Sequence, residues 1–459
     1  MGRVGGGPWV STMSVTAETI PGLAKSVRAR ASREPRGKLL FLDGLRGIAA
    51  LYVVIHHEAQ IYMGEKCFPQ PFFYRLYPYM ILGNFAVVAA IVMSGFCLML
   101  SVVRSEDATL RGGLGAYLWR RYRRLAPGFY AAIAVSLLLV ACVPAMRRHD
   151  GELWSFAFPT SDWRSIFGWK IILSHVLMLH ALSPNWIMRI DPPMWSVGVE
   201  WINIFLMPLL LLPLWRRAGG ALLAILATVL CFLPFATRPI FHDDRFTFQW
   251  AQPWLVAQFA YGMAAAALLY PKHTPERFRR LDRAALRVAV HPVVLVVLVI
   301  AFYFCGTYRR VPLTFLTGVA TVCVTLHCAL GTRVGRLLIK PLESGFALWL
   351  GMISYSLYLL HTPLQMLFQR AMEPLHLPAG VRLAALLTLA TPLMLLAGAI
   401  GYRFFERPFL DAAIRSRETD RGPEHGPSDR AQLAQTLPSH AASAADPIAV
   451  AVADGGLAG

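Results

Sequence analysis

FLDGLRGIAALYVVIHHEAQ, from Phe41 to Gln60, is an apolar membrane-helix pattern that carries five ionisable side chains, namely Asp43, Arg46, His56, His57 and Glu58. A charged side chain near the centre of a spanning helix costs about 2.5–3.5 kcal/mol on insertion scales, so such residues usually face a bundle interior or a water-filled cavity. Eleven helical residues make three turns plus about 20°, which places His57 over Arg46, about 16 Å along the axis. His56 points about 80° away from that line. The pattern predicts a functional pair, Arg46 and His57; the alternative is a shorter helix with His56 and His57 in an interfacial loop.

The composition indicates a membrane protein. Of the 459 residues, 56% are hydrophobic and 15% are charged, and the mean hydropathy is +0.50, which is too apolar for a soluble two-domain protein. The formal net charge is +18, but Lys and Arg gather in short segments between apolar runs, as expected for cytoplasmic loops, so we expect no nucleic-acid partner. The seven cysteines show no CxxC and no metal-ligand spacing. The sequence therefore predicts neither a metal site nor a disulfide framework, with most cysteines acting as small buried hydrophobes.

The apolar segments predict an all-α, polytopic membrane protein with about ten spanning helices. Each segment provides the roughly 17–25 residues that a span needs, and they lie near residues 41–62, 79–102, 125–145, 195–214, 218–236, 250–270, 288–305, 312–331, 345–367 and 383–405. Ten spans with both termini in the cytoplasm place the basic segments at 120–124, 216–217, 272–287 and 333–340 on the cytoplasmic side. Counting the stretch 166–182 as an eleventh span would move the last three segments outside. We therefore expect 166–182 to be an interfacial or re-entrant helix in a long extracytoplasmic loop at 146–194.

The two ends of the chain differ from the rest in composition. Residues 1–38 and 411–459 are rich in Ala, Gly, Pro, Ser and charged residues and have no apolar period. They are expected to be disordered cytoplasmic tails that flank one membrane domain at 39–410.

Four arginines precede the third predicted span in AYLWRRYRRLAPGFY, residues 116–130. Arg121 and Arg124 are three residues apart and so share a helix face, and Pro127 is expected in the first turn of the span. One interpretation is topological, because a basic cluster at a cytoplasmic boundary marks orientation or contacts anionic lipid. The other is a phosphate clamp, because guanidinium groups bind phosphate bidentately.

Two further apolar segments carry polar side chains. In PPMWSVGVEW, residues 192–201, Glu200 must be hydrogen-bonded, paired with a cation or exposed to a cavity, because an unpaired carboxylate in a spanning helix is costly. A structural partner and a site role both remain open for it. In GMISYSLYLLHTPL, residues 351–364, interhelical hydrogen bonding is the favoured role of the polar residues Ser354, Tyr355, Tyr358 and His361.

Six motifs in order give the chain a resemblance to a known family. LDGLRGIAALYVVIHH, MSGF (93–96), RRYRRLAP, MWSVGVE, SYSLYLLHTP and ERPF (406–409) together resemble the acyltransferase 3 family of integral-membrane O-acyltransferases. The resemblance covers about residues 39–410. Its arginine and histidine separated by ten residues fall on Arg46 and His57, and its RxxR pair falls on Arg121 and Arg124. The departures are Trp201 in place of a second glutamate, Gly198 in place of a small hydroxyl residue, and Ala90 and Ile91 in place of paired aromatics before SGF.

The resemblance implies transfer of an acyl group, acetyl above all, from cytoplasmic acyl-CoA to a hydroxyl of a carbohydrate or other glycosylated acceptor. Acyl-CoA is a donor substrate, and no permanently bound cofactor is expected. His57 is the expected general base, and Arg46 the expected partner of the developing oxyanion or the thioester carbonyl. Asp43 and Glu200 complete the expected catalytic set, with Asp43 or Glu58 orienting His57, and Arg121 and Arg124 bind the CoA phosphates. A histidine acyl-enzyme is the main variant. The expected location is the inner (cytoplasmic) membrane.

A second class of function also fits buried ionisable residues in a helix bundle. A proton-coupled transporter or flippase for a lipid-linked sugar or metabolite could use Arg46, His57 and Glu200 as a proton relay. The sequence shows neither inverted-repeat symmetry nor paired broken helices at matching positions of two halves, which counts against this class. Thioester consumption separates the two functions. The acceptor, the acyl chain length and the oligomeric state are not specified by the sequence.

Overall fold

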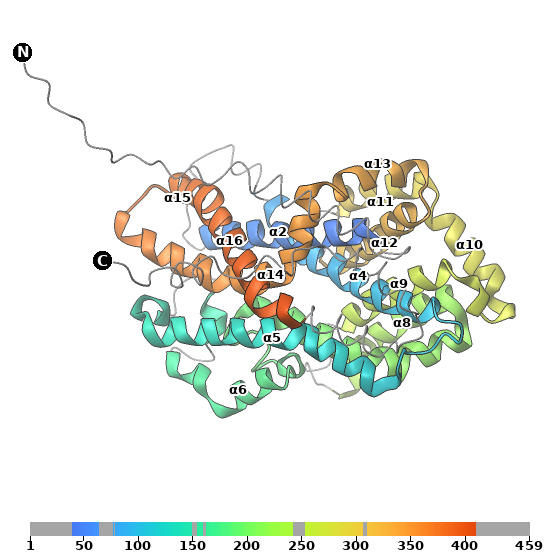
Figure 1. Cartoon of the computed structure of the whole chain (residues 1–459), viewed down its shortest axis with the longest axis horizontal. Coiled ribbons are helices and arrows are strands. Elements are labelled where there is room, and N and C mark those ends of the chain that lie inside the picture. Colours follow the sequence, from blue (N-terminus) through green and yellow to red (C-terminus); the bar gives the residue numbers. More distant parts are fainter. Residues whose placement is uncertain are drawn as a thin grey trace, which may run out of the picture. The chain divides into compact units, whose positions relative to one another are not determined.

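A computed structural model of the protein describes residues 39–63, 77, 79–148, 154–158, 162–241, 253–305 and 310–409, and every regular element in these ranges is helical (Figure 1). The predicted tails at 1–38 and 411–459 lie outside the described residues. The α-helices are α2 (Leu40–Met63), α4 (Gly83–Val103), α5 (Gly113–Cys142), α6 (Trp169–Val176), α7 (Trp195–Leu206), α8 (Leu212–Phe241), α9 (Pro253–Leu268), α10 (Arg279–Ala289), α11 (Pro292–Cys305), α12 (Arg310–Ala329), α13 (Arg333–Leu342), α14 (Gly345–Met372), α15 (Ala379–Ala385) and α16 (Thr391–Gly401). Short π-helical turns extend three of them: η6 (Met207–Leu211), η11 (Leu386–Ala390) and η12 (Tyr402–Glu406).

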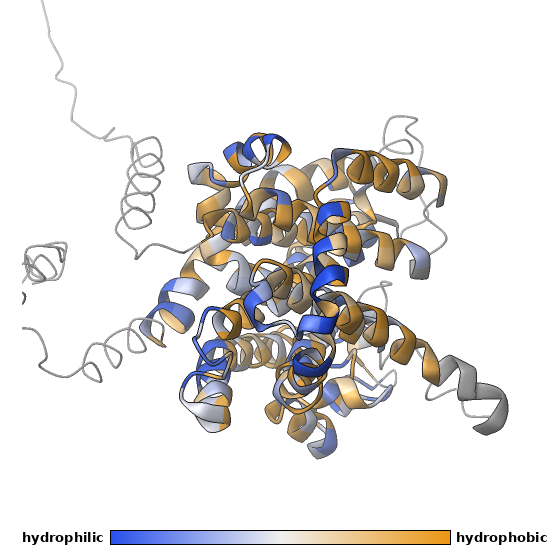
Figure 2. Cartoon of the chain, turned by 90° about the vertical axis from the view of Figure 1, so that its right-hand side faces the viewer, coloured by the Kyte–Doolittle hydropathy of each residue, from blue (hydrophilic) through white to orange (hydrophobic). Residues whose placement is uncertain are grey.

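The helices are apolar enough for a polytopic membrane protein (Figure 2). Among the described residues, six helices are long and apolar enough to cross a membrane, and up to eight if each of two bent helix pairs is one span. Each of the ten predicted segments overlaps a helix. The count of eight is lower than the predicted ten for two reasons. Helix α9 has only 16 residues, and the 42 residues 192–233, which contain two predicted spans, count as one segment. The number ten and the orientation of the termini stay predictions.

A backbone break at Gly219 divides the long segment 192–233. Gly219 has φ 75°, in the left-handed region that favours glycine, so two helices meet there within α8. The carboxylate of Asp282 on α10 accepts hydrogen bonds from the backbone N–H groups of Gly220 (3.1 Å) and Ala221 (2.8 Å), and one from the hydroxyl of Thr274 (2.8 Å). A buried carboxylate at these first amides caps the second helix as an N-cap side chain does. The break therefore supports two separate spans, as predicted for 195–214 and 218–236.

The helix boundaries correct one local prediction and confirm another. The third helix was expected to begin near residue 125, but α5 begins at Gly113, so Pro127 lies inside the helix and not in its first turn. The arginine cluster therefore lies within α5, which begins before the apolar stretch and includes the polar residues that precede it. The segment 166–182 forms short helical turns and the eight-residue helix α6, about 12 Å long, which cannot span a bilayer.

The first helix packs very closely against α14. A Cβ atom on Gly47 would collide with the backbone nitrogen of Gly351, and a Cβ atom on Gly351 would collide with the carbonyl oxygen of Asp43. Small residues at such a crossing let two membrane helices approach backbone to backbone. This close crossing holds α2 against α14, and both helices contribute residues to the candidate site.

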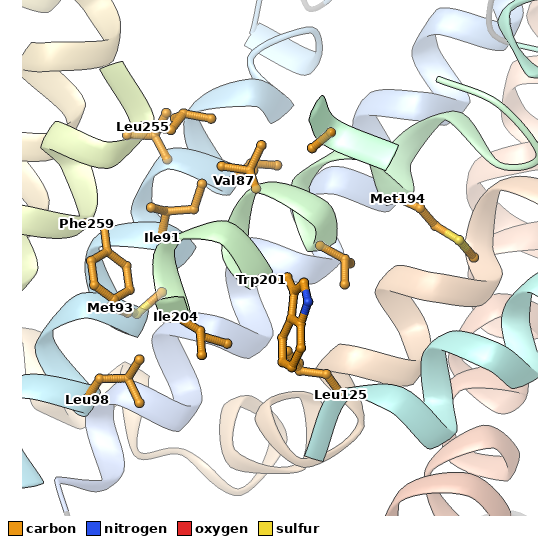
Figure 3. Packing of buried hydrophobic residues seen from close by; sticks show 14 of the residues in the cluster. Val87, Ile91, Met93, Leu98, Leu125, Met194, Trp201, Ile204, Leu255 and Phe259 are labelled. Atoms are coloured by element: carbon orange, nitrogen blue, oxygen red, sulfur yellow. The ribbon is translucent and has the colours of Figure 1, made fainter. Parts of the chain in front are cut away.

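The apolar core joins helices that are distant in the sequence. Figure 3 shows side chains from four helices converging on one another, with Val87, Ile91, Met93 and Leu98 from α4, Leu125 from α5, Trp201 and Ile204 from α7, and Leu255 and Phe259 from α9. All of them are buried. Close packing of this kind fixes the relative positions of α4, α5 and α7, which are three of the helices that carry the candidate site residues.

The predicted topology can be tested by cysteine labelling. In a background without native cysteines, His376→Cys, in the turn after α14, should react with a membrane-impermeant maleimide from outside the cell. Arg280→Cys, on α10, should react only after permeabilisation, because its basic segment is expected in the cytoplasm. Both side chains are exposed, so their reactivity reports the side of the membrane. Labelling of Arg280→Cys from outside would contradict the ten-span arrangement.

Candidate active site

A cavity of about 430 Å³ lies between α2, α4, α5, α7 and α14. Its polar lining includes five of the six residues singled out from the sequence, namely Asp43, Arg46, Arg121, Arg124 and Glu200. Several of the buried apolar residues in Figure 3 form its wall, among them Val87, Ile91, Leu98, Leu125 and Ile204. Packing of the five helices thus brings together charged side chains from three distant motifs.

Guanidinium groups dominate the charge of the cavity. The lining contains four arginines and two carboxylates, which leaves a surplus of two positive charges: Arg46, Arg104, Arg121 and Arg124 against Asp43 and Glu200. Arg104 follows the end of α4, and its Nε donates to the hydroxyl of Tyr270 (3.0 Å). Arg104 could not be singled out from the sequence, because a single arginine after an apolar helix is indistinguishable from a topology signal. A cavity with this balance suits an anionic ligand.

Arg46 forms local contacts at the cavity wall. Its Nη1 lies 3.3 Å from Oδ1 of Asp43, one turn earlier on α2, and both side chains are about one-quarter exposed, at 25% and 29%. Its Nη2 lies 3.9 Å from Sγ of Cys97 on α4. Cys97 therefore faces the cavity and the arginine, and Cys142 is exposed, whereas the prediction of small buried hydrophobes holds for Cys231, Cys323 and Cys328.

Arg121 and Arg124 present their guanidinium groups to the cavity from α5. The Nε of Arg121 is buried and has no hydrogen-bond partner within the described part of the chain. A buried N–H donor without a partner is costly. Its two neighbours in the cluster do not line the cavity: Arg120 donates to the carbonyl oxygen of Arg111, and Arg123 lies over the ring of Trp119, 6.0 Å from its centre. The cluster thus divides by contact with the cavity: Arg121 and Arg124, called the inward pair, line it, and Arg120 and Arg123, called the outward pair, do not.

Glu200 has both a hydrogen-bond partner and a place in the cavity wall. Its Oε1 accepts a hydrogen bond from the hydroxyl of Ser94 on α4 (2.8 Å). One turn earlier on α7, the hydroxyl of Ser196 lies 2.7 Å from that of Tyr358, which also donates to the carbonyl oxygen of Pro193 (2.7 Å). The two alternatives for Glu200 are therefore compatible, since a bond to Ser94 holds the carboxylate at the cavity.

The predicted interhelical role of the tyrosines on α14 is confirmed. Tyr355 donates to the carbonyl oxygen of Leu125 on α5 (2.9 Å), and Tyr358 links α14 to α7 as described. Ser354 instead donates within its own helix, to the carbonyl oxygen of Gly351 (2.9 Å). Both tyrosines line the cavity, so they connect its walls as well as the helices.

His57 lies outside the cavity lining. The residues of α2 that line the cavity end at Val53, and those of α14 end at Tyr358. His57 is four residues beyond Val53, or about 6 Å along the axis, and His361 is three residues beyond Tyr358. The rings of His57 and His361 stack with centres 5.2 Å apart, and His56 lies 4.8 Å from His57. We call His56, His57 and His361 the histidine cluster. It sits one helical turn beyond the end of the cavity.

The structure decides between the alternatives for the end of α2. The helix continues to Met63, so His56 and His57 are helical and the loop alternative is wrong. Glu58 is fully buried and accepts a hydrogen bond from the hydroxyl of Thr391 on α16 (3.0 Å). Asp43 is paired with Arg46. Neither predicted orienter contacts His57. The nitrogen Nδ1 of His57 instead lies 2.7 Å from Oε1 of Gln60, a contact that only the i, i+3 spacing could have suggested.

Arg46 and His57 lie far apart on one continuous helix. Their separation is about 16 Å along the axis, so the two side chains do not contact each other directly. The role of Arg46 at an oxyanion stays a prediction, and the helix places Arg46 in the wall of the cavity and His57 beyond its end.

Two of the departures from the expected motif have a packing reason. Trp201 is buried, and its ring lies 6.2 Å from that of Tyr122 and 5.1 Å from that of Phe205, away from the cavity lining. A Cβ substituent on Gly198 would lie 2.8 Å from Nε2 of His180. His180 stacks on His175 with ring centres 4.4 Å apart, and burial lowers the pKa of His180 to about 3. A neutral, packed histidine therefore occupies the space that a hydroxyl side chain at 198 would need.

Comparison with known proteins agrees with this architecture. A family profile described as an acyltransferase domain matches residues 39–403. The chain belongs to the acyltransferase 3 family. The match covers most of the 459 residues and includes the cavity and the histidine cluster. The chain is therefore a multi-pass membrane acyltransferase. No curated protein and no solved structure matches it.

Proposed function

We propose that this membrane acyltransferase moves an acyl group, acetyl in the simplest case, from cytoplasmic acyl-CoA to a hydroxyl of a carbohydrate or other glycosylated acceptor. The observation that carries the proposal is the arrangement of the site. A histidine cluster lies on α2 and α14 one helical turn beyond the end of a cavity with surplus guanidinium groups. An anionic donor and a general base would thus occupy the two ends of one path. We place the protein in the inner (cytoplasmic) membrane.

The basic end of the cavity would bind the phosphates of the donor. Arg121 and Arg124 are the best placed, because they face the cavity from a cytoplasmic basic segment and Arg121 retains an unpartnered N–H among the described residues. Guanidinium groups bind phosphate bidentately, with charge-assisted hydrogen bonds. Arg46, paired with Asp43, would add to the positive charge near the phosphates. Glu200 would keep its hydrogen bond from Ser94. These three residues then serve donor binding and not bond making.

The pantetheine arm would extend through the cavity and bring the thioester to His57. Neutral imidazole takes the proton of the acceptor hydroxyl while that oxygen attacks the thioester carbonyl carbon. The tetrahedral intermediate collapses, the C–S bond breaks, and the imidazolium returns the proton to the departing thiolate of CoA. The products are the ester and free CoA, and His57 is neutral again.

The acceptor would approach from the side opposite to the donor. In the ten-span arrangement, the arginine end of α2 faces the cytoplasm, so the histidine cluster lies toward the extracytoplasmic side. A cytoplasmic acyl donor and an external hydroxyl could then meet within the bundle. This geometry requires no transport of the acceptor across the bilayer.

The proposal is tested by thioester consumption. Purified protein in lipid nanodiscs should release CoA thiol from acetyl-CoA in the presence of a glycan acceptor, and the ester should be found on the acceptor by mass spectrometry. Surface glycans and secreted metabolites from a deletion strain, compared with a strain complemented with the wild-type gene, would identify the acceptor. A protein that moves a sugar or metabolite across vesicles without consuming thioester would be the transporter considered above.

A further inference from the structure

Gln60 is the only described side chain within hydrogen-bond distance of the imidazole of His57. Its Oε1 lies 2.7 Å from Nδ1 of His57, one helical turn away on α2. With the amide oxygen facing Nδ1, this contact is a hydrogen bond only when Nδ1 carries the proton, because an amide oxygen can only accept. A neutral imidazole carries one proton. With that proton on Nδ1, Nε2 is the basic nitrogen. No hydrogen-bond partner occupies Nε2 in the part of the chain that the structure describes.

The rest of the surroundings holds the ring of His57 without hydrogen bonding to it. His56 on α2 and His361 on α14 contact its ring, 4.8 and 5.2 Å between centres. Both nitrogens of His361 have partners: Nδ1 lies 2.6 Å from the carbonyl oxygen of Tyr358 and Nε2 lies 3.1 Å from the hydroxyl of Thr362. His361 can therefore hold the ring by stacking but cannot select its tautomer.

An uncharged acceptor at position 60 has a chemical consequence. The carboxylate next in the chain, Glu58, bonds to Thr391 on α16, so among the described residues His57 has two histidine rings and one amide as its polar neighbours. A carboxylate partner would stabilise the imidazolium form and retain the proton. An amide oxygen orients the ring and fixes the tautomer with no added charge, so the base stays neutral and the proton can return to the leaving thiolate.

We propose that Gln60 is a positioning residue for the transfer reaction: its amide oxygen fixes the Nδ1–H tautomer of His57 and so directs the basic Nε2 toward the acceptor hydroxyl. The inference rests on the proposed function, in which His57 is the base. Gln60 itself touches neither donor nor acceptor.

The test compares three variants of the full chain in nanodiscs. Gln60→Met keeps the length of the side chain but removes the acceptor, and kcat should fall by about 10–100-fold with little change in the KM for acetyl-CoA, as for removal of an orienting partner. Gln60→Glu keeps an acceptor oxygen and should retain more activity than Gln60→Met. Because its carboxylate favours imidazolium, the acidic limb of the pH–rate profile should move to higher pH by about one unit.

Gln258→Met on α9 is the matched control. It makes the same amide-to-thioether change at a buried helical position, and neither amide atom of Gln258 has a hydrogen-bond partner among the described residues. Its kcat and pH profile should equal those of the wild type.

Three outcomes separate the possibilities. Wild-type kcat and pH profile in folded Gln60→Met, with His57→Ala inactive, would overturn the role of Gln60 and leave the proposed function intact. A lower kcat in Gln60→Met with an unshifted acidic limb in Gln60→Glu would reduce Gln60 to a structural residue. Absence of thioester consumption by the wild type would remove the proposed function itself, whereas full activity of His57→Ala would remove His57 as the base and with it the role of Gln60.

Discussion

His57→Ala should abolish acyl transfer while the protein still folds and inserts. A positioned general base contributes about 10²–10⁴ to the rate, and the substitution leaves the acceptor hydroxyl without a proton acceptor beyond the end of the cavity. His57 is only partly buried, so few packing atoms are lost. Activity is measured as CoA thiol release coupled to ester formation on the acceptor.

His56→Ala is the comparison for this prediction. His56 is the adjacent residue on α2 and belongs to the histidine cluster, but its ring packs against Gly83 of α4, where even a Cβ atom would collide with it. The variant should retain a measurable fraction of activity, because the base and Gln60 remain in place. Size-exclusion profiles and thermal unfolding in detergent confirm the folded state of both variants. Full activity in folded His57→Ala would leave the fold and family standing but not the mechanism.

Helix periodicity predicts which residues share a helix face better than it predicts which side chains act together. A spacing of eleven residues in a continuous helix places Arg46 and His57 on one face, and a spacing of three pairs Arg121 with Arg124; the structure retains both relations in α2 and α5. The same arithmetic already separated Arg46 from His57 by about 16 Å. A common role for both at the reacting carbonyl therefore needs a substrate that bridges this distance, and it stays a prediction.

Contacts between helices could not be read from the sequence. The bonds of Glu200 to Ser94 and of Ser196 to Tyr358 depend on which faces meet when α4, α7 and α14 pack. Periodicity gives the face of each helix but not its neighbour. The backbone contact between Gly47 of α2 and Gly351 of α14 could not be predicted either. Glycine in an apolar run indicates a close helix contact but does not specify which helix is the partner.

The second large effect concerns the donor. Replacing both Arg121 and Arg124 by Ala should raise the KM for acetyl-CoA strongly, because each hydrogen bond to a charged group contributes about 1.5–3 kcal/mol, or about 10–100-fold in binding. Lysine at either position should restore part of this affinity, since it supplies charge without the bidentate fork. The KM is measured at several salt concentrations. A smaller dependence on salt is expected in the double alanine variant, because the screened charges are gone.

The outward pair gives a control with the same loss of charge. Arg120→Ala combined with Arg123→Ala removes two arginines from the same turns of α5, but neither lines the cavity. If the cluster only sets topology or contacts anionic lipid, the two double variants should lose insertion and abundance alike and bind the donor equally well. If the inward pair binds phosphate, only the Arg121/Arg124 variant should have a raised KM at normal abundance. Equal donor binding in the two variants would return the whole cluster to its topological role, and the surplus charge of the cavity would then need Arg46 and Arg104 as its explanation.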